Sequence, residues 1–209
     1  MMTTLPTFSA NASESMSPAL LREIIPRFNE RAILVGRTGS GKTTLAEHIC
    51  RHFPYVVVYD PKRRIEWTGF ARYDTLAEVL GAPDWQTHLI YAPIVQERLD
   101  VRGDFAPQVN EFFWWVFERG NTFLYVDEVK LITRGDFAPM GYRAVITSGR
   151  ELNIAVMSAT QRPRRIPQEI LSETEHVYAF ALQLQQDRDR MVEVTGESFP
   201  PLSGHDFAY

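Results

Sequence analysis

The residues of this chain with the clearest chemistry form a glycine-rich run that follows an apolar stretch and precedes a helical pattern. The run fits G-x-x-x-x-G-K-[ST] without a mismatch; its members are Gly36, Arg37, Thr38, Gly39, Ser40, Gly41, Lys42 and Thr43. Residues 32–35 are apolar, and residues 44–50 follow as a helical pattern. A strand, a glycine loop and a helix N-terminus together point backbone N–H groups at phosphate. We therefore predict that the chain binds a nucleoside triphosphate.

The last residues of the loop have predicted individual contacts. Lys42 is expected to reach the β- and γ-phosphates, and the Thr43 hydroxyl is expected to bind Mg²⁺. Thr44, which opens the helix, is counted with the phosphate-binding residues. The alternative is a glycine turn that merely opens an ordinary helix. The complete match and the correct flanks favour phosphate binding.

Composition limits what else the chain can be. It has 209 residues, 44% of them apolar and 23% charged, which suits one α/β domain. Its net charge of −4 excludes a basic nucleic-acid-binding protein, so any contact with a polyanion must be a local patch. The single cysteine, Cys50, excludes an internal disulfide and indicates a reducing compartment. We expect Cys50 to be buried in the helix after the loop.

The chain contains no pattern typical of a signal peptide or a membrane span. Its N-terminus lacks a basic start and an apolar core, and no apolar run approaches the roughly 20 residues of a membrane helix. We expect a cytoplasmic protein. Residues 1–18 are rich in Ser, Thr, Ala and Pro, and are predicted to be a flexible segment or an arm for a neighbouring subunit. Residues 19–209 are predicted to form a single ATPase domain.

Strand patterns alternate with helical patterns, which predicts an α/β fold with a mostly parallel central sheet flanked by helices on both faces. The apolar runs are continuous rather than alternating, as in strands buried on both faces. The predicted strands are 31–35, 55–59, 88–91, 122–126, 153–159 and 176–181. The predicted helices are 42–52, 75–80, 107–119, 138–149 and 184–194.

Two further strand ends carry polar residues suited to nucleotide hydrolysis. Asp127 and Glu128 follow a buried strand, and Gln161 follows the next one. Asp127 is expected to hold Mg²⁺, Glu128 to orient and deprotonate the attacking water, and Gln161 to sense the γ-phosphate or position the water. A helix-capping Asp-Glu pair is the alternative. The second acid favours an NTP hydrolase over a small kinase, which must exclude water.

The order of these motifs resembles the FtsK–HerA superfamily of ring-forming DNA translocases. Besides residues 36–43, the resemblance rests on Val58-Tyr59-Asp60-Pro61-Lys62, Val126-Asp127-Glu128, Gly149-Arg150-Glu151-Leu152-Asn153-Ile154 and Ser158-Ala159-Thr160-Gln161-Arg162-Pro163. It covers residues 30–182 and implies a RecA-like P-loop NTPase fold of the ASCE class. The small size resembles the stand-alone genome-packaging ATPases of tailless icosahedral viruses with an internal membrane.

The resemblance also implies how the chain works. It implies ATP and Mg²⁺ as cofactors, a homo-oligomeric, hexameric ring with an ATP site at each subunit interface, and double-stranded DNA in the central channel. An arginine of the neighbouring subunit is expected to complete each site. Arg150 is the first candidate and Arg143 the second. For a virus, we expect the host cytoplasm, association with the virion vertex, and a partner at the capsid vertex or in the membrane.

Four further features have open interpretations. Residues 62–64 and 162–165 are the densest basic clusters, and either contact phosphates or a neighbouring subunit, or are solvated. The aromatic run 112–117 favours core packing over an interface. The sequence Arg-Gly-Asp-Phe-Ala-Pro occurs at 102–107 and again at 134–139, either by coincidence or as two loops that face one ligand.

Three other functions compete with a packaging motor. A HerA-like helicase or conjugation ATPase shares the same motifs. A small nucleotide or metabolite kinase matches the length, but usually needs an arginine-rich lid. A nucleotide-gated switch that binds without hydrolysis is opposed by Glu128.

Overall fold

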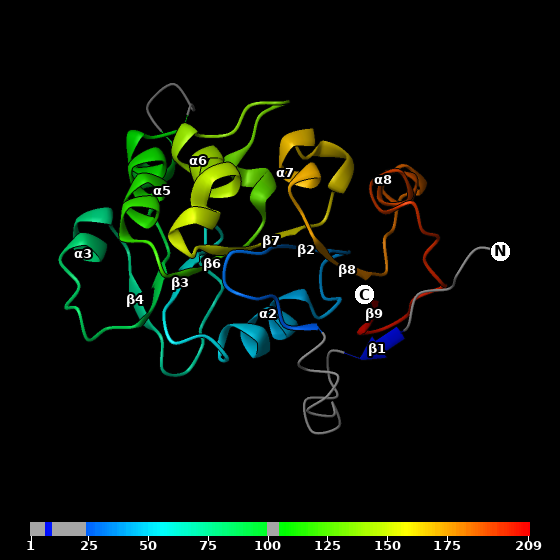
Figure 1. Cartoon of the computed structure of the whole chain (residues 1–209), viewed down its shortest axis with the longest axis horizontal. Helices are drawn as coiled ribbons and strands as arrows, with labels where there is room; N and C mark the ends of the chain where they lie inside the picture. Colours follow the sequence, from blue (N-terminus) through cyan, green and yellow to red (C-terminus); the bar gives the residue numbers. More distant parts are fainter. Residues whose placement is uncertain (1–6, 10–23, 100–104) are drawn as a thin grey trace.

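The computed structural model describes residues 7–9, 24–99 and 105–209 (Figure 1). Within these residues nine strands form one sheet, in the order β1-β9-β8-β2-β7-β6-β3-β5-β4. The strands from β8 to β4 in this order are parallel, and β1 and β9 are antiparallel additions at one edge. Their bounds are β1 (Thr7–Ser9), β2 (Arg31–Val35), β3 (Val56–Tyr59), β4 (Ala71–Tyr73), β5 (His88–Tyr91), β6 (Phe123–Val126), β7 (Ala155–Thr160), β8 (His176–Phe180) and β9 (Asp206–Ala208).

The helices cover the two faces of the sheet unequally (Figure 1). Helix α2 lies on one face, while α3, α5, α6, α7 and α8 lie on the other side. The α-helices are α2 (Lys42–Cys50), α3 (Leu76–Leu80), α4 (Val95–Arg98), α5 (Pro107–Arg119), α6 (Met140–Ser148), α7 (Gln168–Ser172) and α8 (Gln185–Thr195). Three short 3₁₀ helices connect them: η1 (Val129–Ile132), η2 (Gly149–Leu152) and η3 (Pro163–Arg165). The predicted α/β fold is confirmed.

Alternate side chains of each central strand supply two separate cores. Along β2, Ile33 and Val35 join the core under α5 and α6, whereas Ala32 and Leu34 join the core that packs on α2. This is the pattern expected of a parallel strand covered on both faces. Cys50 is fully buried in the second core, as predicted.

The aromatic run predicted to lie in the core does so on one side of α5. Phe112 and Phe113 are fully buried and pack on Tyr59 and Tyr142. Gly141 of α6 lies directly on this helix, because a Cβ atom there would stand 2.7 Å from the Asn110 carbonyl oxygen. The close approach of α5 and α6 therefore depends on a glycine.

Three edge strands differ from the predictions. β4 and β9 were not predicted, because three residues are too few to show a period. Residues 7–9 of the predicted flexible segment form strand β1, which pairs with β9. The rest of that segment, 1–6 and 10–18, lies outside the described residues. In the part of the chain that is described, no helix has the length and apolar character needed to span a membrane.

Candidate active site

The glycine loop connects the end of β2 to the start of α2, at the carboxyl edge of the sheet (Figure 1). Gly36 lies against β8, and a Cβ atom at Gly36 would stand 2.5 Å from Phe180 Cβ. Gly41, the last residue before α2, has a φ of +97°, in the left-handed region that favours glycine. The loop conformation therefore requires glycine at both ends, and it leaves the N-terminus of α2 open toward the cavity.

Lys42 extends back over this loop. Its Nζ donates hydrogen bonds to the carbonyl oxygens of Gly36 and Arg37, at 2.7 and 2.8 Å. Lys42 is 8% exposed, and this burial lowers its pKa to about 8, although Glu128 and Asp127 nearby act in the opposite direction. The ammonium group is thus poorly solvated and close to two carboxylates, so the pKa of Lys42 is sensitive to any anion in the cavity.

Asp127 and Thr43 meet at the hydroxyl of Tyr125. The Tyr125 hydroxyl donates to Asp127 Oδ1 at 3.0 Å, and the Thr43 side chain hydrogen-bonds to the same phenol. Burial raises the pKa of Asp127. A cation bound close to the carboxylate would lower this pKa again, because it stabilises the charged form. One carboxylate and one hydroxyl, together with phosphate oxygens, are the donors that Mg²⁺ prefers. These residues therefore fit a magnesium ion that is shared with the nucleotide.

Glu128 occupies an unusual backbone conformation at the start of η1. Its φ and ψ are +64° and +70°, which costs a residue other than glycine about 1–3 kcal/mol. This conformation turns the carboxylate toward the end of β7. There Oε1 accepts hydrogen bonds from Thr160 Oγ1 at 3.0 Å and from the Gln161 N–H at 3.3 Å. Strain of this kind concentrates at functional sites.

The second oxygen of Glu128 has two side-chain partners. Oε2 accepts from Lys62 Nζ at 3.0 Å and from Gln161 Nε2 at 2.9 Å. The other end of the Gln161 amide accepts from the Thr38 hydroxyl at 2.7 Å. A continuous hydrogen-bonded chain therefore connects the glycine loop to Glu128 and to the lysine that follows β3.

These groups surround one cavity of about 470 Å³. Its lining includes seven of the residues predicted to act on the nucleotide: Thr38, Gly39, Lys42, Thr43, Asp127, Glu128 and Gln161. Lys62 and Arg64 add positive charge to the same cavity. The contact of Lys62 with Glu128 was not predicted, because it depends on the path of the loop after β3.

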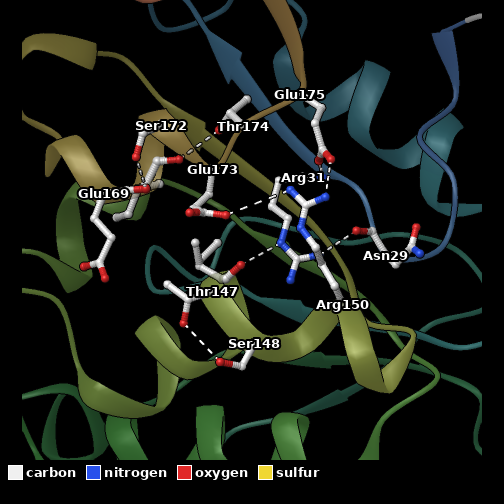
Figure 2. Close-up of polar contacts among 12 residues, drawn as sticks. Asn29, Arg31, Thr147, Ser148, Arg150, Glu169, Ser172, Glu173, Thr174 and Glu175 are labelled. Carbon is white, nitrogen blue, oxygen red and sulfur yellow. Dashed lines mark hydrogen bonds and ion pairs between the residues drawn. The ribbon is translucent and has the colours of Figure 1, made fainter.

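The predicted arginines lie away from this cavity. Arg150 is in η2, which precedes β7 and therefore lies at the amino edge of the sheet. Its guanidinium contacts Glu175 and Glu173 (Figure 2). Arg143 of α6 makes two hydrogen bonds to Glu169, at 2.7 and 3.1 Å. The fold thus does not join either arginine to the phosphate loop of its own chain.

The other predicted clusters have definite surroundings. Arg162 forms an ion pair with the buried Asp187 at 2.9 Å, which fixes the start of η3 beside α8. Phe105 of the first Arg-Gly-Asp-Phe-Ala-Pro copy lies under Arg134 of the second, with the guanidinium 4.9 Å from the ring centre. Both copies line a separate cavity of about 450 Å³. Residues 102–104 lie outside the described residues, and a ligand for these loops stays a prediction.

Comparison with known proteins agrees with this fold. A family model described as "ATPase family associated with various cellular activities (AAA)" matches residues 32–182, which include the glycine loop and the strands from β2, without its first residue, to β8. The DNA packaging ATPase P9 of Enterobacteria phage PRD1 is 29% identical over 188 residues, covering 85% of this chain and 73% of the phage protein.

Solved structures share the fold at lower sequence identity. The genome packaging NTPase B204 from Sulfolobus turreted icosahedral virus 2, in complex with AMP, has a TM-score of 0.62 at 15% identity, covering 85% of this chain and 90% of that one. The same NTPase in complex with ATP-gammaS has a TM-score of 0.60 at 15% identity, covering 80% and 82%.

Proposed function

Because the chain belongs to the AAA family of ATPases and is an NTP-hydrolysing enzyme, we propose that it moves double-stranded DNA into a viral capsid by hydrolysing ATP. The observation that carries the proposal is the cavity in which Lys42, Asp127 and Glu128 converge. The relative with a DNA packaging name, aligned over 85% of the chain, supports the viral role.

Each residue of the cavity has its own proposed role in ATP hydrolysis. The N–H groups of the glycine loop and the Lys42 ammonium bind the β- and γ-phosphates. Mg²⁺, held by Thr43 and Asp127, would neutralise charge on the transferring phosphoryl group. Glu128 takes a proton from the attacking water, and Gln161 orients that water beside the γ-phosphate. Gln161 contacts both Thr38 and Glu128, and these contacts support a role in signalling the presence of the γ-phosphate to the base.

Among the described residues of one chain, Arg64 is the arginine that lines this cavity, whereas Arg150 and Arg143 do not. An arginine supplied by a neighbouring subunit can stabilise the charge that develops on the transferring phosphoryl group. We propose that Arg150 of a neighbouring copy fills this role in a ring, because such contacts speed phosphoryl transfer by about 10³-fold or more. β2 has five residues, so the two edges of the sheet are about 17 Å apart. An arginine at the amino edge can therefore act on a nucleotide only in another subunit, which favours a ring of copies; we propose the hexameric ring that the family resemblance implies.

Contacts with DNA are proposed for the basic segment 162–165, of which Arg164 and Arg165 lie exposed at η3. Phosphate contacts do not depend on base sequence, as a motor that moves any DNA requires. During assembly we place the ring in the host cytoplasm, at the capsid vertex, where a vertex or membrane protein is its partner.

The experiment is the steady-state rate of ATP hydrolysis with and without long double-stranded DNA. Glu128→Gln serves as the control for contaminating ATPases. We expect DNA to raise the wild-type rate several-fold and to leave the variant inactive. A rate that is indifferent to DNA would contradict the translocase proposal and favour a nucleotide-gated switch.

A further inference from the structure

Arg31, the first residue of β2, is a buried arginine whose guanidinium forms no ion pair with any carboxylate of the described residues. Arg31 is 1% exposed. Its side chain donates to four backbone carbonyl oxygens at 2.8–2.9 Å, those of Asn29, Val145, Ile146 and Ile154. A buried charge is costly, and a protein retains one where it fixes a specific arrangement or serves a site.

The carbonyls that Arg31 binds enclose the turn that carries Arg150. Val145 and Ile146 belong to the last turn of α6, where a cation interacts favourably with the helix dipole. Ile154 immediately precedes β7. Arg31 therefore binds backbone carbonyls on both sides of η2, at the end of α6 and just before β7. Gly149 lies close to the guanidinium, since a Cβ atom there would stand 3.4 Å from Arg31 Nη2.

Glu175 connects Arg31 directly to Arg150. Glu175 Oε2 accepts from the Arg31 backbone N–H at 2.6 Å, and the Glu175 N–H donates to the Arg31 carbonyl oxygen at 3.0 Å. Its other carboxylate oxygen, Oε1, accepts from Arg150 Nη1 at 2.5 Å. Glu173 approaches Arg150 Nη2 to 3.9 Å (Figure 2). The direction of the Arg150 side chain is thus set relative to the first residue of β2.

Electrostatics favour this arrangement and keep Arg150 outward. Burial and, to a smaller extent, the neighbouring charge of Arg150 lower the pKa of Arg31 to about 10. The two guanidinium groups repel each other across the turn, while Glu173 and Glu175 attract both. Arg31 is fixed by its four carbonyls, so Arg150 is the group that is displaced toward solvent, where its side chain is 41% exposed.

We propose that Arg31, Glu175 and Glu173 are positioning residues that hold Arg150 ready for the triphosphate of a second copy of this chain. The inference rests on the proposed function of Arg150. Five N–H donors allow the guanidinium to keep its bond to Glu175 while it binds phosphate oxygens with the others. β2 then carries the phosphate loop of one site at its carboxyl end and the support for the next site's arginine at its amino end.

The test is a double-mutant cycle on the ATPase rate of the full-length protein, with Glu175→Gln and Arg150→Ala. We expect Glu175→Gln to lower kcat about tenfold and to leave KM for ATP unchanged, because the changed residue lies far from the bound nucleotide. In the Arg150→Ala background the same change should have no effect, since the group that it positions is absent. Glu169→Gln, which removes the partner of Arg143 nearby, is the matched control and should leave kcat unchanged.

Two outcomes for Glu175→Gln overturn the proposal. One is a normal kcat for Glu175→Gln, and the other is an equal loss with and without Arg150, which indicates a structural role. If Glu175→Gln is poorly folded by circular dichroism, Glu173→Gln replaces it, because Glu173 contacts Arg150 and, within the described part of the chain, makes no hydrogen bond to β2. For Glu173→Gln we expect a twofold to threefold loss of kcat, again dependent on Arg150.

Full activity of Arg150→Ala itself overturns both this inference and the proposal that Arg150 acts in trans. A wild-type ATPase rate that does not respond to DNA, with Arg150→Ala still inactive, contradicts only the proposal that the protein moves DNA.

Discussion

Lys62 Nζ lies 3.0 Å from Glu128 Oε2, so the proposed catalytic base is an ion-paired carboxylate. Including this bond, Glu128 accepts four hydrogen bonds, two at each oxygen. A carboxylate has about four acceptor positions, so a water molecule can bind Glu128 only when one of these partners moves. Lys62 and the Gln161 amide are side-chain donors that share Oε2, and they are the partners free to move.

Lys62→Met should destabilise the fold, because it leaves the 7%-exposed Glu128 without its cation. We expect a loss of about 1–2 kcal/mol in the free energy of unfolding, since Glu128 keeps three hydrogen bonds and Lys62 is partly exposed. Glu128→Gln removes the unpaired charge, so the same lysine change should then cost little. Urea unfolding of the two single variants and the double variant measures this coupling.

Lys130→Met provides the control for that cycle. Lys130 is in η1, next to Glu128, and donates to the Thr133 carbonyl oxygen at 3.1 Å rather than to a carboxylate. Its replacement should have the same small effect with or without Glu128. Equal losses for Lys62→Met in both backgrounds would show that the ion pair contributes nothing to stability.

Glu128→Gln should bind ATP and hardly hydrolyse it. The amide keeps the size of the side chain but cannot accept a proton from water, and loss of a general base costs about 10²–10⁴ in rate. The Kd of a fluorescent ATP analogue should change less than severalfold. The rate constant of single-turnover hydrolysis should fall by at least about a hundredfold. Near-normal turnover would assign the base to another residue.

The parts of the site that the sequence predicts are those at the ends of buried parallel strands. Lys42, Asp127 and Gln161 follow β2, β6 and β7, and neighbouring parallel strands end at one edge of a sheet. Each could be predicted because a continuous apolar run marks its strand. Their convergence follows from topology alone.

The contacts that were not predicted depend on the paths of loops. Lys62 reaches Glu128 because the buried Asp60 carboxylate accepts from the N–H groups of Lys62 and Ile65 and shapes the turn after β3. Arg31 contacts carbonyls more than 100 residues away, at 146 and 154. A charged residue that opens a fully buried strand is visible in the sequence, but its partners are not.

The stability of the protein should depend on pH through Lys42. Its pKa is about 8 in the folded chain, below the ordinary value of 10.5. Between these two values the unfolded chain binds more protons, so the contribution of Lys42 to stability rises with pH through this window and is least favourable below pH 8. Lys42→Met lacks this titration. Its stability relative to the wild type should therefore decrease as the pH is raised from 7 to 10.

Thermal unfolding of both proteins at several pH values measures that difference. The lost carbonyl hydrogen bonds of Lys42 give a constant offset, because a neutral amine still donates. The change in the difference with pH is therefore the quantity to compare. A difference that stays constant from pH 7 to 10 would show that the pKa of Lys42 is not lowered by burial.

Arg150→Ala should lower the ATPase rate of the assembled enzyme by about 10²-fold or more. Mixing with a second, differently inactive variant should restore part of that activity. Lys42→Ala subunits have no working site but keep Arg150, so mixing them with Arg150→Ala subunits places an intact arginine beside an intact site. A random equal mixture should recover up to about a quarter of wild-type activity, since roughly one interface in four is then complete. The measurement is the ATPase rate after mixing, compared with each variant alone. Arg143→Ala, tested in the same way, should retain wild-type turnover, because two hydrogen bonds to Glu169 hold the Arg143 guanidinium, whereas Arg150 makes one to Glu175. No recovery on mixing, or inactivation by Arg143→Ala instead, would move the trans arginine from Arg150 to another residue.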